Sequence, residues 1–130
     1  MSKTNLEAAR ALLLKAENDW QTAAIGLRHG APLDGVCFHF QQAAEKVLKA
    51  LLASRGVDYP LTHDLRDLLV LAVAHFPALE EFRESLPRYT VYAVAMRYDA
   101  TMVPSAEETQ EAHEIIERLR HVVRDLLPGE

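Results

Sequence analysis

Basic side chains in the middle of the chain could bind a phosphate group. Lys46 and Lys49 could pair with phosphate as point charges, or with Glu45 and a neighbouring helix. His63 lies at the predicted start of a later helix, where backbone N–H groups favour an anion, although a histidine there could equally cap the helix or pack against it. Whether these residues form one site depends on how the helices bring them together.

A second set of candidate ligands surrounds Arg97. This arginine could pair with phosphate, or it could complement the carbonyl groups at the end of its predicted helix. Tyr98 follows it, and the preceding turns contain further groups that could stack on a base or bind phosphate, namely Arg88, Tyr89 and Tyr92. Core packing is the other interpretation of this segment, because Tyr89, Tyr92 and Met96 recur at helical spacing.

The sequence lacks the common catalytic motifs. It contains no Glu-x-x-His pair of a di-iron bundle, no His-Glu-x-x-His, no glycine-rich phosphate loop and no nucleophile elbow. Cys37 is the only cysteine, which excludes an intrachain disulfide and a cysteine-built zinc site, and its apolar neighbours predict a buried, unreactive thiol. We therefore expect no metal site and no cofactor.

Composition places the chain among globular proteins. Its 130 residues are 49% hydrophobic and 25% charged, with a formal net charge of −5. An acidic balance argues against a general nucleic-acid binder, although it leaves room for a local basic groove. No apolar run approaches the roughly 18–20 residues of a membrane span, so we expect a cytoplasmic protein without a membrane partner.

The six prolines divide the chain into segments of helical length. Hydrophobic periodicity predicts helices over residues 4–29, 33–55, 78–86 and 88–98, with further helices starting at Thr62 and at Ser105. Gly30 and Gly56 lie where the first two helices should end, and Asp64 should lie in the first turn of the helix capped by Thr62. We expect an all-α, up-and-down bundle of about five helices, forming a single domain (1–130) with a core over about 5–127.

The second predicted helix has a polar side that could be covered. At about 100° per residue, Gln42, Glu45, Lys46 and Lys49 fall opposite the apolar face. This stripe could simply be solvated. However, Phe38 and Leu52 project into the same sector, which suggests cover by another helix, a second subunit or a ligand groove.

Three short motifs follow one another along the chain: Gln42-x-x-Glu45-Lys46-x-x-Lys49-Ala50, then Thr62-His63-x-Leu65, then Arg97-Tyr98. Together they resemble the HEPN domain family (higher eukaryotes and prokaryotes nucleotide-binding). The family pattern has an aromatic residue followed by Gln-x-x-Glu-Lys-x-x-Lys-Ala, then a Thr-His-x-Leu helix start, then Arg-Tyr, then a final amphipathic helix. The positions of this sequence that match the pattern are Gln42, Glu45, Lys46, Lys49, Ala50, Thr62, His63, Leu65, Arg97 and Tyr98. The resemblance extends over about residues 5–127.

The resemblance implies a five-helix bundle that is commonly dimeric. Small prokaryotic members are often encoded beside a minimal nucleotidyltransferase, and many such pairs look like toxin–antitoxin systems. If such a partner transfers AMP, Tyr98 beside Arg97 is the expected acceptor. The resemblance therefore implies a homodimer, a nucleotidyltransferase partner and a nucleotide or RNA ligand.

The chain departs from the pattern of the ribonucleases in this family. Those members use Arg, then four to six residues, then His, but the corresponding positions after Arg97 hold Met102, Val103 and Pro104. We therefore favour a non-catalytic binding module, whose ligand-binding residues would be Gln42, Glu45, Lys46, Lys49, His63, Arg97 and Tyr98. The alternative is a divergent, metal-independent ribonuclease toxin in which Arg97 acts with His63 or His121.

Overall fold

The computed structural model describes residues 3–127, and every regular element in that range is helical. The α-helices are α1 (Lys3–Arg28), α2 (Leu33–Ser54), α3 (Leu65–His75), α4 (Ala95–Tyr98) and α5 (Ala106–Leu126). Two 3-10 helices, η1 (Pro77–Phe82) and η2 (Leu86–Tyr92), lie between α3 and α4. The all-α class predicted from periodicity is confirmed.

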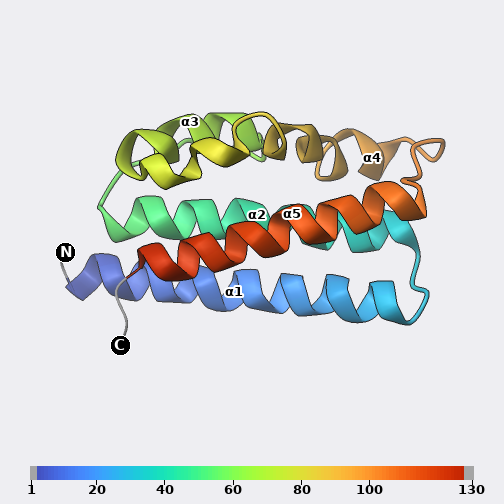
Figure 1. Ribbon diagram of the computed structural model, residues 1–130, viewed down its shortest axis with the longest axis horizontal. Helices are drawn as coiled ribbons and strands as arrows, with labels where there is room; N and C mark the ends of the chain where they lie inside the picture. Colours follow the sequence, from blue (N-terminus) through green and yellow to red (C-terminus); the bar gives the residue numbers. More distant parts are fainter. Residues whose placement is uncertain (1–2, 128–130) are drawn as a thin grey trace.

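Helix α2 forms the centre of the bundle. Figure 1 shows α1 along one side of α2, the segment from α3 to α4 along the other, and α5 crossing α2. Phe40, Leu48 and Leu51 of α2 are fully buried, and they pack in one core with Trp20 of α1 and Leu119 of α5. Burying an aliphatic or aromatic side chain of this size stabilises the fold by roughly 1.5–3 kcal/mol. The central helix is therefore fixed in position by three neighbours.

The helix ends are those that the capping residues predict, except at the start of α3. Ser105 and Glu108 form the expected capping box, and Gly30 and Gly56 adopt φ values of 76° and 66°. The prediction that Thr62 caps the third helix is wrong, because that helix begins at Leu65 and the side chain of Asp64 accepts a hydrogen bond from the backbone N–H of Arg66. An aspartate is a slightly better cap than a threonine, and here it ends the loop two residues later than expected.

The segment between α3 and α5 also differs from the prediction. Residues 77–98 form two 3-10 helices and a single α-turn, not the helices expected over 78–86 and 88–98. Buried Leu86, Tyr89 and Tyr92 are spaced by three residues, a period that a 3-10 helix places on one edge. The core interpretation of Tyr89, Tyr92 and Met96 is therefore correct, since all three are buried.

Cys37 is buried, as its apolar neighbours predicted. Its Sγ lies 3.3 Å from the hydroxyl of Thr109 on α5, and burial raises the pKa of the thiol. A raised pKa lowers the fraction of thiolate, so this cysteine is protected from oxidation and alkylation.

Candidate functional site

One side of α2 carries a row of side chains that we call the α2 stripe: Phe38, Gln42, Glu45 and Lys49. Their spacings of four, three and four residues place them within about 60° of one another around the helix. The sector is covered by parts of the same chain, because Glu45 and Leu52 are buried while Phe38, Gln42 and Lys49 are half-buried. The solvated-face interpretation of this stripe is therefore wrong.

Glu45 is the centre of a buried polar network. Its side chain is only 4% exposed, and it accepts hydrogen bonds from Nδ1 of His63 at 2.9 Å, Nζ of Lys49 at 3.0 Å and Nε2 of Gln41 at 3.3 Å. Gln41 also donates to the backbone carbonyl of His63 at 3.0 Å. A buried carboxylate needs such partners, so the network ties the loop before α3 to α2.

A second carboxylate, Asp19 of α1, neutralises Lys46. Asp19 Oδ2 accepts from Lys46 Nζ at 2.5 Å, and Oδ1 lies 2.8 Å from Nδ1 of His39. Asp19 and His39 were not predicted, because the sequence alone does not show which residue of another helix lies beside Lys46. The seven-residue spacing of His39 and Lys46 on α2 was the one available signal, since it places both on one side.

Arg97 lies at the other end of the α2 stripe from His63. Its guanidinium is 4.7 Å from the ring centroid of Phe38, a cation–π geometry, and the residue is exposed. A shallow hollow of about 250 Å³ surrounds this pair, and it is lined by Asp34, Gly35, Phe38, Met96 and Arg97. Phe38 and Glu45 are seven residues apart, so about 10 Å of α2 separates this hollow from the Glu45 network.

The predicted residues thus divide into separate groups. Gln42 donates to Gln41 at 2.8 Å and so joins the Glu45 network, whereas Tyr98 is 86% exposed on α4. His121 lies on an exposed position of α5. Within residues 3–127, no hydrogen bond or ring contact joins Arg97 to His63 or to His121.

The comparisons with known proteins concern the family and the fold of the chain. The model of the HEPN domain family matches residues 9–126, which is most of the chain. The chain belongs to the HEPN family. The solved structure of TT1696 from Thermus thermophilus is similar, with a TM-score of 0.74 and 27% identity over 92% of this chain and 98% of that one. No curated protein matches.

Two features are absent from the described part of this HEPN domain, a cluster of metal-ligating groups and a helix able to span a membrane. The part of the chain that the structure describes contains no group of three or more His, Cys, Asp or Glu side chains placed to hold a metal ion. None of the helices within that part is both long and apolar enough to cross a bilayer. At the two ends of the α2 stripe, the accessible groups are the guanidinium of Arg97 over the ring of Phe38 and the exposed side of His63.

Proposed function

We propose that this HEPN domain is a non-catalytic binding module that recognises a nucleotide or an RNA phosphate at Arg97. The supporting observation is the exposed guanidinium of Arg97 held over the ring of Phe38. A planar cation on an aromatic ring offers two donors to a phosphate and a flat surface for a base. Within the described residues, no carboxylate forms an ion pair with this arginine.

The two lysines of α2 contribute less than the sequence indicated. Lys46 is paired with Asp19 and Lys49 with Glu45, so each would have to break an internal ion pair before it bound phosphate. Arg97 is the primary ligand in this proposal. Gln42 belongs to the Glu45 network, and His63 is bonded to Glu45, about two helical turns of α2 from Phe38. Binding should therefore depend far more on Arg97 than on Lys46 or Lys49.

The proposal also includes a homodimer and a minimal nucleotidyltransferase partner, in a pair of the toxin–antitoxin kind. The homodimer and the partner are proposed from membership of the family. Modification by the partner is proposed from the accessibility of Tyr98, which is 86% exposed and so leaves its hydroxyl open to an enzyme. In AMP transfer, the Tyr98 oxygen would attack the α-phosphorus of ATP, pyrophosphate would leave, and the phenolic proton would pass to a base of the partner. The intact mass of the chain after incubation with the partner and ATP would test this step.

The experiment that tests binding is a calorimetric titration of the full chain with ATP and with a short single-stranded RNA. We expect Arg97→Ala to weaken binding about tenfold, which corresponds to about 1.4 kcal/mol. Arg66→Ala is the matched control, because Arg66 is also an exposed arginine but lies on α3. Equal loss in both variants, or no binding by the wild type, would overturn the proposal.

One observation favours the alternative, a divergent metal-independent ribonuclease. Nδ1 of His63 is held by a buried carboxylate while its side chain is 61% exposed, the arrangement of a histidine oriented for proton transfer. An inducible-expression growth assay with total RNA on a gel separates the two functions. Growth arrest with cleaved RNA, lost in Arg97→Ala and in His63→Ala, would establish the ribonuclease and exclude the non-catalytic module.

A further inference from the structure

The hollow at Arg97 contains an acidic side chain as well as a basic one. Asp34, in the first turn of α2, lines the hollow together with Arg97. It lies four residues before Phe38, about 6 Å along the helix and nearly on the same side. Among residues 3–127, neither Asp34 nor Arg97 belongs to an ion pair. One carboxylate and one guanidinium thus line the same hollow without neutralising each other.

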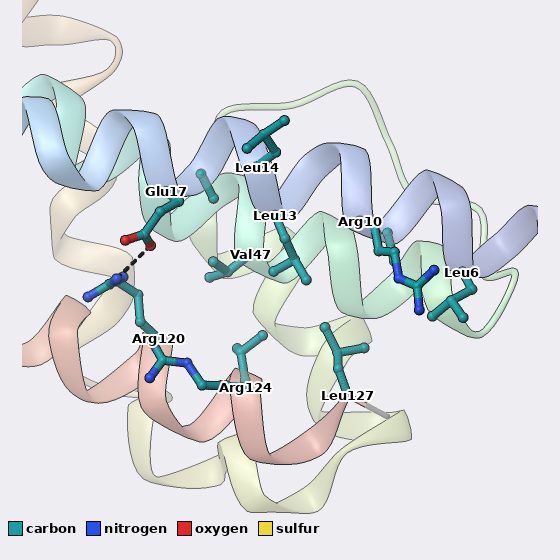
Figure 2. A pocket seen from close by; sticks show the side chains of 12 residues that line it. Leu6, Arg10, Leu13, Leu14, Glu17, Val47, Arg120, Arg124 and Leu127 are labelled. Atoms are coloured by element: carbon teal, nitrogen blue, oxygen red, sulfur yellow. Dashed lines mark hydrogen bonds and ion pairs between the residues drawn. The ribbon is translucent and has the colours of Figure 1, made fainter. Parts of the chain in front are cut away.

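Another hollow of the molecule is different in this respect. A groove of about 450 Å³ between α1 and α5 has a largely apolar lining that includes Arg120 and Glu17. Figure 2 shows these two side chains joined to each other, and Nη2 of Arg120 lies 2.5 Å from a carboxylate oxygen of Glu17. An arginine already paired with a carboxylate of its own chain has fewer donors left for an anion. In the hollow at Arg97, by contrast, the acid and the base are both available to a ligand.

The carboxylate of Asp34 can accept further hydrogen bonds. Asp34 is exposed, and within the described part of the chain its carboxylate accepts one hydrogen bond, from the backbone N–H of Gly35 to Oδ1 at 2.9 Å. An ionised carboxylate has about four lone-pair sites and no proton to donate, so it binds hydroxyl or amino groups and repels a phosphate. A ligand whose phosphate pairs with Arg97 must therefore present a donor group to Asp34.

Gly35 leaves the backbone of α2 uncovered beside Asp34. The φ of Gly35 is not positive, and a Cβ added to it would meet no atom within 4 Å. Neither the backbone conformation nor the packing therefore requires glycine here, where alanine would favour the helix more. Close approach of a ligand to the backbone is a further reason for glycine at a position. Since Gly35 lines the same hollow, it leaves room for part of a ligand next to Asp34.

On the basis of the phosphate binding proposed above at Arg97, we propose that Asp34 makes this site selective for ribonucleotides over deoxyribonucleotides. With the phosphate on Arg97, the ribose 2′-hydroxyl donates a hydrogen bond to the carboxylate of Asp34. Acidic side chains bind the same hydroxyl in dinucleotide-binding folds. A deoxyribonucleotide lacks this donor and leaves the carboxylate without a partner in the complex, so it binds less tightly.

The test is a calorimetric titration of the full chain with AMP, dAMP and IMP. We expect AMP to bind about tenfold more tightly than dAMP, because dAMP lacks a hydrogen bond to a charged group. IMP keeps the ribose but lacks the exocyclic amino group of adenine, and it should bind within about twofold of AMP. Equal affinities for AMP and dAMP would overturn the inference. So would a loss of about tenfold for IMP, because Asp34 would then accept from the base.

Two variants test whether Asp34 is the residue responsible. Asp34→Ala should weaken the binding of AMP about tenfold and leave the binding of dAMP unchanged, so that the two affinities become equal. Asp67→Ala is the matched control, because Asp67 is also an exposed aspartate in the first turn of a helix, but of α3, and it should leave the preference for AMP intact. Equal weakening of AMP and dAMP by Asp34→Ala would show that Asp34 does not read the hydroxyl, and the inference would be wrong.

The titrations also separate this inference from the function on which it rests. If AMP and dAMP bind equally and Arg97→Ala weakens both about tenfold, phosphate binding at Arg97 stands and the selectivity is wrong. If the wild type binds neither nucleotide, or if Arg97→Ala changes neither affinity, the proposed function fails and the selectivity fails with it.

Discussion

Replacing Glu45 should destabilise this HEPN domain more than replacing any exposed carboxylate. The Glu45 side chain is 4% exposed and accepts from Lys49, His63 and Gln41. Hydrogen bonds to a charged group contribute about 1.5–3 kcal/mol each, but His63 and Lys49 can turn partly to water once the carboxylate is lost. We therefore expect Glu45→Gln to lower the free energy of unfolding by about 1–2 kcal/mol, and Glu45→Ala by about 2–3 kcal/mol because it also leaves a cavity.

The assay is urea unfolding of the full chain at neutral pH and fixed protein concentration, followed by circular dichroism. Glu80→Gln is the matched control, because Glu80 is an exposed carboxylate paired with Arg83 one turn away, and we expect no measurable loss. A double-mutant cycle with His63→Ala should give a coupling energy of about 1 kcal/mol with Glu45→Gln. The stabilising role of the network would be refuted if Glu45→Gln were as silent as Glu80→Gln.

Three further predictions concern other parts of the bundle. Glu17→Gln should lower the free energy of unfolding by about 0.5 kcal/mol at neutral pH. Because the pKa of Glu17 is lowered in the folded chain, this difference between variant and wild type should disappear as the pH falls through that pKa. Unfolding experiments at acid pH would measure it. Burial is the first cause that raises the pKa values of Tyr89 and Tyr92. The two tyrosines should therefore stabilise the fold below pH about 10 and lose that contribution as pH rises. Phenolate absorbance should show them ionising only when the chain unfolds. Asp64→Ala should lower the free energy of unfolding by about 1 kcal/mol and Thr62→Ala by less, measured by urea titration, because Asp64 caps α3; a larger effect at Thr62 would contradict this cap.

Much of the fold could be predicted because local rules and packing agree in the long helices. In α5, the capping box at Ser105 and the apolar spacing of Ala112, Leu119 and Val122 indicate the same helix, and the structure contains it. The segment over 77–98 was mispredicted because apolar steps of three and four residues suit both an α-helix and successive 3-10 turns. Tertiary packing of Leu86, Tyr89 and Tyr92 decided between them.

The candidate site was harder to predict, because charge pairing across helices is invisible in one sequence. The pattern placed Glu45 and Lys49 on one side of α2, but it could not show that burial would turn Glu45 inward toward His63. It also missed Asp19, which lies on α1 and pairs with Lys46. These pairs change the chemistry of the site, since they leave Arg97 as its principal exposed cation.

An amide NMR titration of the full chain with AMP tests the central claim most directly. We predict that the largest shift changes fall on Gly35, Phe38 and Arg97, around the hollow at the end of α4, and that Arg97→Ala abolishes them while Arg66→Ala does not. Phosphate binding at Arg97 would be contradicted by shift changes confined to residues away from this hollow. It would also be contradicted if no changes appeared at AMP concentrations up to about 10 mM, because an ordinary specific site would be occupied well below that concentration.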